Sequence, residues 1–124
     1  MSFNILVVED YKVTRMMIKK MLEKGTDWKI SEAQDGQMAF DFLQTKTPDL
    51  IILDLMMPKM NGFEFLKKIK SIPKIDKIPI LILTGLKSVE DEMIGLQSGA
   101  NDYLTKPIKM DTLIARCKKL LNAN

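Results

Sequence analysis

The clearest indication of the fold is Leu50-Ile51-Ile52-Leu53-Asp54, where four consecutive apolar residues end at a carboxylate. Two other runs have the same form, Ile-Leu-Val-Val at residues 5–8 and Ile-Leu-Ile-Leu at residues 80–83. Runs that are apolar throughout, instead of alternating with polar residues, are typical of strands buried on both faces of a parallel sheet. We expect two weaker flanking strands at residues 29–33 and 102–105.

Stretches of helical spacing separate these strands. Apolar residues recur every three or four positions within residues 13–21, 37–43, 63–69, 89–96 and 113–121. Strands that alternate with helices form a parallel sheet with helices on both of its faces. The sequence therefore predicts an α/β, doubly wound fold of five βα units, as one domain that spans residues 1–124.

The helical spacing also predicts which side chains face the core. We expect most of the ten methionines to fill the core from these helices. Cys117 is expected to be a buried structural thiol on the last helix. In the first and fourth helices the expected core-facing residues are Val13, Met16, Met17 and Met21, and Val89, Met93 and Leu96.

Composition excludes several classes of protein. The chain has 124 residues, 46% hydrophobic and 28% charged, which is ordinary for a globular domain and unlike a disordered one. One cysteine and no histidine exclude an internal disulfide and any histidine-based metal site or nucleophile pair. No apolar run approaches the roughly 18 residues of a membrane span, and the N-terminus lacks a basic signal segment. We expect a cytoplasmic monomer that does not insert into membranes.

The net charge of +3 comes from acidic and basic side chains that are mostly interspersed. One mildly basic stretch lies between residues 67 and 77 and has no aromatic residues interleaved in a recognition motif. We interpret it as a solvated helix face and expect no direct binding to nucleic acid.

Polar side chains with a shared chemistry end the strands. Glu9 and Asp10 follow the first strand, Asp54 follows the third, Thr84 ends the fourth and Lys106 follows the fifth. Ligands of such sheets bind at the carboxyl ends of the strands. Clustered carboxylates repel one another and attract a cation, and oxygen ligands without histidine or cysteine favour Mg²⁺. Carboxylates, Mg²⁺ and an ammonium together suit phosphoryl transfer to a nucleophilic aspartate. Neither glycine-rich nucleotide motif is present, so we expect a donor other than a bound nucleotide.

Four segments carry a resemblance to a known family. They are Glu9-Asp10, residues 54–62 (Asp-Leu-Met-Met-Pro-Lys-Met-Asn-Gly), Thr84-Gly85, and residues 98–107 (Ser-Gly-Ala-Asn-Asp-Tyr-Leu-Thr-Lys-Pro). In this order and spacing they resemble the response-regulator receiver domain of two-component signalling systems, most of all its stand-alone, CheY-type members. The resemblance extends over residues 4–121. It implies a flavodoxin-like three-layer sandwich with a five-stranded parallel sheet of order 2-1-3-4-5.

The resemblance also implies a role for each site residue. It makes Asp54 the phosphoacceptor, with Asp10 and Asp54 as direct ligands of Mg²⁺ and Glu9 acting largely through water. The backbone carbonyl of Met56 would complete the metal site, and Lys106 would contact the phosphoryl group.

Thr84 and Tyr103 resemble the family's switch pair. The hydroxyl of Thr84 would move to a phosphoryl oxygen, and the ring of Tyr103 would rotate inward to fill the vacated space. The Lys106-Pro107 bond is a candidate cis peptide.

The resemblance implies a histidine kinase or phosphotransfer protein as the phosphoryl donor. It also implies a downstream protein that reads the face formed by the fourth helix, fifth strand and fifth helix.

Some residues depart from the family pattern. Gly85 stands where alanine is more usual, and the apolar Met56 and Leu86 are expected to shape attack by water and so the lifetime of the phosphorylated state. An acidic cluster, Glu90-Asp91-Glu92, lies on the fourth helix. A chemotaxis or motility target is therefore one expected output, among others that the sequence leaves open.

Three other interpretations remain. A Mg²⁺-dependent phosphatase of the haloacid-dehalogenase type also has a nucleophilic aspartate after an apolar strand, but its D-x-D motif would need an acid where Met56 stands. A pseudo-receiver would have the fold without phosphorylation, although it would not need the full set of site residues. The chain could also be the receiver of a longer regulator. We expect a signalling protein that promotes only its own phosphorylation and dephosphorylation, and not an enzyme acting on other substrates.

Overall fold

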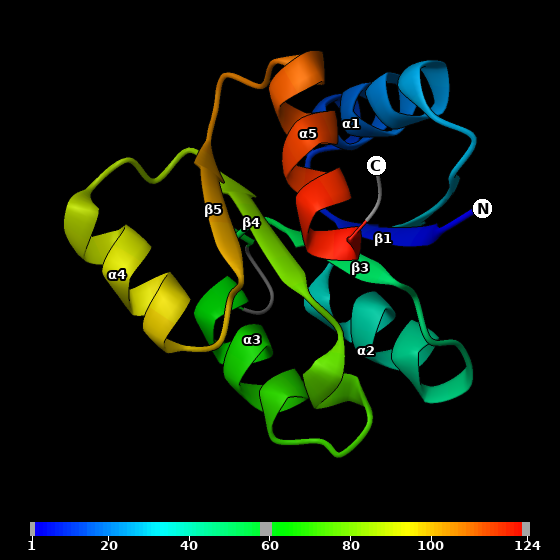
Figure 1. Ribbon diagram of the computed structural model, residues 1–124. Helices are drawn as coiled ribbons and strands as arrows, with labels where there is room; N and C mark the ends of the chain where they lie inside the picture. The colour runs from blue at the N-terminus through cyan, green and yellow to red at the C-terminus, as the bar shows by residue number, and fades with distance from the viewer. Residues whose placement is uncertain (1, 58–60, 123–124) are drawn as a thin grey trace.

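The computed structural model describes residues 2–57 and 61–122, in which strands and helices alternate along the chain (Figure 1). The strands are β1 (Asn4–Val8), β2 (Lys29–Ala33), β3 (Leu50–Leu53), β4 (Ile80–Thr84) and β5 (Asp102–Thr105). The helices are α1 (Lys12–Gly25), α2 (Gly36–Thr45), α3 (Gly62–Lys70), α4 (Val89–Gln97) and α5 (Met110–Leu121), with a short 3₁₀ turn, η1 (Ile75–Lys77), before β4.

The strands form one parallel sheet in the order β2-β1-β3-β4-β5. This order confirms the predicted topology. Val8 pairs with Leu53 at the ends of β1 and β3, and Thr84 pairs with Thr105 at the ends of β4 and β5. The carboxyl ends of these strands therefore lie along one edge of the sheet.

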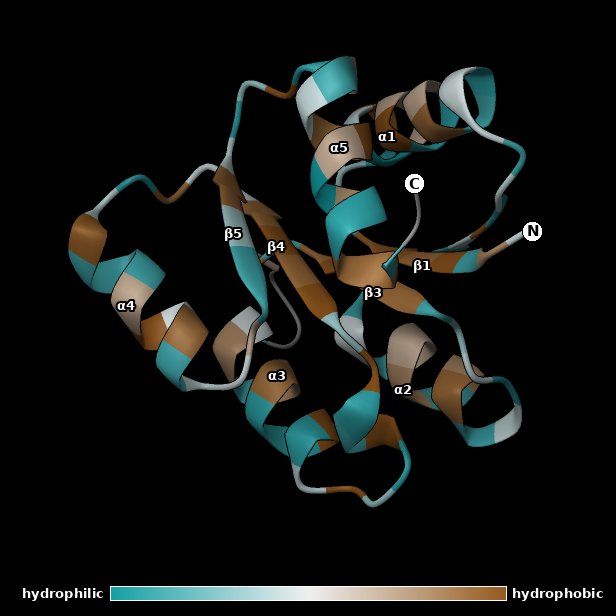
Figure 2. Cartoon of the chain, viewed as in Figure 1, coloured by the Kyte–Doolittle hydropathy of each residue, from teal (hydrophilic) through white to brown (hydrophobic). Residues whose placement is uncertain are grey.

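Helices cover both faces of the sheet, which gives the predicted three layers. In Figure 1, α1 and α5 lie on one side of the strands and α2, α3 and α4 on the other. Because side chains alternate along a strand, each strand supplies residues to both cores. Leu6 and Ile51 pack with Leu66 of α3, whereas Ile5 and Ile52 belong to the opposite core with α1 and α5. Figure 2 shows the resulting apolar colour of β3 and β4.

The prediction that the methionines mostly fill the core is wrong for the residues that the structure describes. In α1 the buried residues are Ile18 and Leu22, whereas Met16 and Met17 are 42% and 40% exposed. Met57 is buried, but the exposed methionines are Met16, Met17, Met38, Met56, Met93 and Met110. Met1 and Met60 lie outside the described residues.

The predicted core-facing side of α4 is also wrong. Val89 is 72% exposed and Met93 is 52% exposed, and the buried residue of this helix is Gly95. Gly95 lets α4 approach the sheet closely, because a Cβ there would lie 2.9 Å from Ile82 Cδ1. The apolar residues of α4 therefore face outward.

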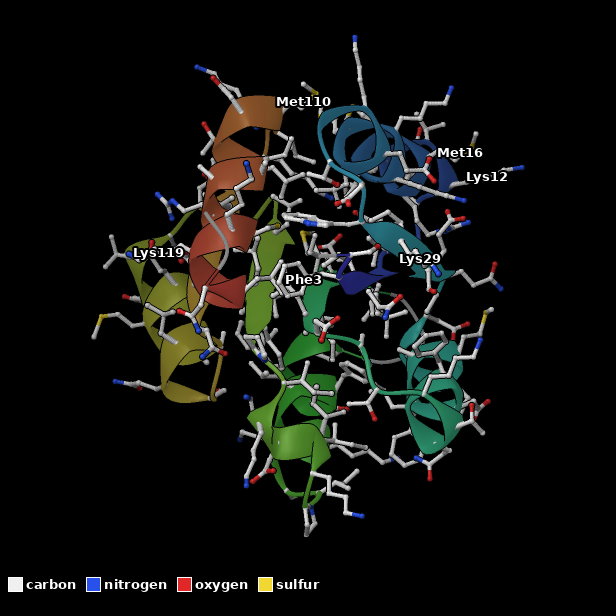
Figure 3. The ribbon with its side chains drawn as sticks, turned by 45° about the vertical axis from the view of Figure 1, so that its right-hand side comes forward. Phe3, Lys12, Met16, Lys29, Met110 and Lys119 are labelled. Carbon is white, nitrogen blue, oxygen red and sulfur yellow. The ribbon has the colours of Figure 1, made fainter. Side chains whose placement is uncertain are left out.

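The exposed residues of α1 border a surface hollow of about 630 Å³. Val13, Met16, Met17 and Met110 contribute to its wall. Figure 3 shows the side chains of Met16 and Met110 at the outer surface of α1 and α5.

Two smaller expectations are confirmed. The Lys106-Pro107 peptide is cis. Cys117 is a buried free thiol, and burial, together with the charge of Asp102, raises its pKa to about 12. Among the described residues, no helix is both long and apolar enough to cross a membrane.

Candidate functional site

The carboxyl ends of β1 and β3 bring three carboxylates together. Glu9, Asp10 and Asp54 each offer an oxygen within 4.8 Å of the others. Backbone hydrogen bonds extend the sheet ladder to these positions, because the Glu9 N–H donates to the Ala33 carbonyl and the Asp54 N–H to the Val8 carbonyl. The sheet itself therefore sets the spacing of the acidic cluster.

Lys106 completes this cluster from the end of β5. Its Nζ donates to Glu9 Oε1 at 2.7 Å and to Asp54 Oδ2 at 3.2 Å. Burial alone lowers the pKa of Lys106, but the hydrogen bond to Glu9 and the charges of Asp54 and Glu9 outweigh it, so the pKa is raised. Lys106 is therefore held as a cation against the two buried carboxylates.

Burial within this cluster disfavours the charged form of Glu9. Its side chain is almost inaccessible to water, at 1% exposed, and burial raises its pKa from 4.5 to about 7. The hydrogen bond from Lys106 opposes this shift, and the charge of Asp54 adds to it. The single ammonium of Lys106 is thus insufficient to neutralise the three carboxylates of the cluster. The site therefore has an excess of negative charge at neutral pH.

The donor set fits a hard divalent cation. Its ligand atoms are carboxylate oxygens, without histidine or cysteine, and Mg²⁺ prefers oxygen ligands while retaining several waters. Glu9, Asp10 and Asp54 could hold the ion. The predicted contribution of the Met56 carbonyl stays a prediction, although the Met56 N–H is bound at 3.1 Å to Asp54 Oδ1.

Asp54 is fixed by the backbone that follows it. The Gly62 N–H donates to the Leu55 carbonyl at 3.1 Å, where α3 begins. A Cβ at Gly62 would lie 2.4 Å from Leu55 Cα and 2.8 Å from the Asp54 carbonyl oxygen. Only glycine allows this approach, and sequence reasoning did not single out Gly62 for that role.

Thr84 and Tyr103 meet at Leu86. Thr84 is fully buried, and its hydroxyl accepts a 3.4 Å hydrogen bond from the Leu86 N–H. The Tyr103 hydroxyl donates to the Leu86 carbonyl at 2.9 Å. Burial and then the charges of Asp91 and Glu92 raise the pKa of Tyr103.

The ring of Tyr103 already lies inward, at 7% exposed. It packs over Gly95, where a Cβ would lie 3.3 Å from Tyr103 Cδ2 and Cε2. The Tyr103 hydroxyl is bound to the Leu86 carbonyl and does not extend into water. This is the inward position that the switch hypothesis assigns to the ring.

Arg15 is a residue near the site that sequence reasoning missed. Its Nη1 donates to the Glu9 carbonyl at 2.8 Å and to the Asp10 carbonyl at 3.4 Å. An arginine on a surface helix looks like one more solvated charge in the sequence, so no local pattern identifies this contact.

Comparison with known proteins relates the sequence of this chain to one family. The sequence matches the response regulator receiver domain family over residues 5–118. It is 38% identical to "Response regulator MprA" of Mycolicibacterium vanbaalenii over 98% of this chain and 51% of the relative. The chain thus spans about half the length of the curated relatives that it matches.

Solved structures are similar over almost their whole length. The Francisella response regulator 1452 receiver domain is 35% identical, with a TM-score of 0.89 over 97% of both chains. The chemotaxis protein CheY4 of Vibrio cholerae is 32% identical, with a TM-score of 0.90 over 97% of this chain and 99% of that one.

Proposed function

The chain belongs to the response regulator receiver family, and we propose that Asp54 accepts a phosphoryl group from a histidine kinase or phosphotransfer protein. The observation that carries the proposal is the contact of Asp54 with Lys106 inside the cluster of Glu9 and Asp10. A buried aspartate with an ammonium and two more carboxylates has what phosphoryl transfer needs, a nucleophile and a place for a charge-neutralising cation.

The transfer step follows from these groups. A carboxylate oxygen of Asp54 attacks phosphorus in line, a new O–P bond forms, and the P–N bond to the donor imidazole breaks with its electron pair on nitrogen. Glu9, Asp10, Asp54 and the Met56 carbonyl would hold Mg²⁺, which would supply positive charge to the phosphoryl oxygens. Lys106 then turns from Asp54 Oδ2 toward a phosphoryl oxygen, which it can reach because it already contacts the nucleophile.

The signal then passes from Asp54 to the α4-β5-α5 face. A phosphoryl group offers new acceptor oxygens to the Thr84 hydroxyl, and Thr84 and Tyr103 share the Leu86 backbone. Phosphorylation favours the inward packing of Tyr103 through the contacts that the phosphoryl group makes only in that arrangement, as a population shift requires. The outward-facing residues of α4, among them Val89 and Met93, give a downstream protein an apolar surface to read.

The donor protein approaches from the same edge of the sheet. The helix α1 begins two residues after Asp10, and its exposed Val13, Met16 and Met17 supply apolar contacts beside the acidic cluster. A cytoplasmic monomer is part of the proposal, and the single cysteine, a buried free thiol, supports that location. Chemotaxis is one candidate output, favoured by the likeness to the Vibrio cholerae chemotaxis protein.

The phosphatase alternative lacks its second acid. The residue two positions after Asp54 is Met56, whose apolar side chain is 56% exposed. We therefore expect no turnover of p-nitrophenyl phosphate. A pseudo-receiver is disfavoured because Glu9, Asp54 and Lys106 are in mutual contact range, an arrangement that a fold without phosphorylation does not need.

Incubation with acetyl phosphate tests the proposal. The protein is treated with and without MgCl₂, and intact mass is measured before and after hydroxylamine. We expect one phosphoryl group in the presence of Mg²⁺, removed by hydroxylamine as for a mixed anhydride, and none in Asp54→Asn. Asp49→Asn is the matched control, because Asp49 is an exposed aspartate that precedes the same strand. Labelling of Asp54→Asn at the wild-type level would contradict the proposal.

A further inference from the structure

The loop of Glu9 and Asp10 leads into α1 without the side-chain cap that commonly stabilises the start of a helix. Tyr11 precedes α1 and provides no side-chain cap, and the first turn holds no acidic residue. The Tyr11 N–H instead donates to Glu9 Oε2 at 3.2 Å, which occupies one oxygen of a site carboxylate. The sheet holds the Glu9 N–H, whereas the carbonyls of Glu9 and Asp10 are bound by a side chain.

Arg15 is the group in contact with that backbone. Its guanidinium reaches both loop carbonyls from the first turns of α1, and its Nε donates to Glu32 Oε1 at 3.2 Å on β2. The Arg15 side chain is only 13% exposed. One planar group thus joins the loop, α1 and β2, and a planar fork of donors suits such a bridge better than a single ammonium.

We propose that Arg15 is a positioning residue that holds Glu9 and Asp10 in the geometry that binds the divalent cation. The inference rests on the proposed Mg²⁺-dependent function of this site. Arg15 acts through the two loop carbonyls and not by touching the phosphoryl group. Groups that orient metal ligands in this way typically contribute about 10- to 100-fold to metal affinity.

The direction in which replacing Arg15 changes the Mg²⁺ affinity distinguishes a positioning role from a purely electrostatic one. Arg15 is a cation near an acidic site, so removal of its charge alone would make the site more negative and tighten Mg²⁺ binding. Loss of positioning has the opposite result, because the carboxylates no longer converge. Lys19 provides the matched control, since its Nζ lies 3.5 Å from the same Glu32 carboxylate, yet the loop carbonyls are bound by Arg15.

Titration calorimetry with MgCl₂ on the full chain tests this inference. We expect Arg15→Ala to raise the Mg²⁺ dissociation constant about tenfold, with Arg15→Lys between it and wild type. Glu32→Gln is expected to shift the constant in the same direction but less, because the ion pair that anchors Arg15 on β2 becomes a weaker, neutral hydrogen bond. Lys19→Ala is expected to leave the constant unchanged. Melting temperatures verify folding, and Arg15→Lys and Glu32→Gln keep the test decisive if Arg15→Ala does not fold.

A second readout follows the acetyl phosphate reaction at increasing MgCl₂. A positioning role predicts that Arg15→Ala needs more Mg²⁺ for half of its maximal rate, with the maximal rate largely retained. Unchanged or tighter Mg²⁺ binding in a folded Arg15→Ala protein would overturn the inference and leave the proposed function intact. A wild-type protein that binds no Mg²⁺ would overturn both.

Discussion

Replacing Glu9 by glutamine should stabilise the metal-free protein at neutral pH. Glu9 is buried beside Asp54, and burial raises its pKa to about 7. The structure therefore favours the neutral form of this side chain over the charged one, and Glu9→Gln keeps a neutral polar group of similar shape in its place. We expect a residue that serves cation binding to reduce stability when the cation is absent.

The magnitude follows from the shift of the pKa from 4.5 to about 7. A shift of this size corresponds to about 3 kcal/mol. Between these two pKa values the folded protein binds more protons than the unfolded chain, so the free energy of unfolding falls as the pH rises. The contribution of Glu9 is fully present below the unfolded pKa and is lost as the pH rises through the folded pKa.

Urea denaturation in the presence of a chelator, from about pH 5 to about pH 8, measures this dependence. Wild type should lose up to about 3 kcal/mol relative to Glu9→Gln over the range. The exposed Glu23 offers a control, and Glu23→Gln should follow wild type. Saturating Mg²⁺ should stabilise wild type more than Glu9→Gln at the upper end of the range. Identical pH dependence in wild type and Glu9→Gln would refute the reasoning.

Three further predictions concern metal binding, the switch and the phosphoryl lifetime. Asp10→Asn should weaken Mg²⁺ binding by about tenfold or more, measured by calorimetry, because the site loses one ligand and one charge. An unchanged affinity would show that Asp10 is not a metal ligand. Gly95→Ala should push the Tyr103 ring outward, because the new Cβ would lie 3.3 Å from the ring, while a helix propensity gain of about 1 kcal/mol offsets much of the packing loss. Fluorine NMR of fluorotyrosine-labelled protein reports the ring, and an unshifted Tyr103 signal would contradict this. Met56→Glu should change the decay rate of phosphorylated Asp54, followed by intact mass, because we expect the exposed Met56 side chain to shape attack by water. An unchanged decay rate would exclude that role.

The strands and the site were predictable from the sequence for one shared reason. A run such as Leu50-Ile51-Ile52-Leu53 has no polar side chain, so it needs burial on both faces, and a parallel sheet between helices provides that. Charged groups directly after such runs must then collect at one sheet edge. Asp54 and Lys106, which are distant in sequence, meet there at 3.2 Å.

The buried faces of α1 and α4 were not predictable in the same way. Both helices carry apolar residues on more than one side, so their spacing fits two orientations. Tertiary packing determines which side of each helix is buried. In α1 the buried side contains Ile18, and in α4 it contains Gly95, which lies against Ile82 and Tyr103. The support from Arg15 was hidden because it depends on β2, which reaches Arg15 only in the folded chain.

Reduction with borohydride after acetyl phosphate treatment tests the central claim most directly. Borohydride converts an aspartyl phosphate into homoserine, and peptide mass spectrometry then identifies the modified position. We expect homoserine at position 54, dependent on Mg²⁺, and unmodified aspartate at position 10. Homoserine at Asp10, a borohydride-resistant phosphate on Thr84, or no modification at Asp54 would contradict it.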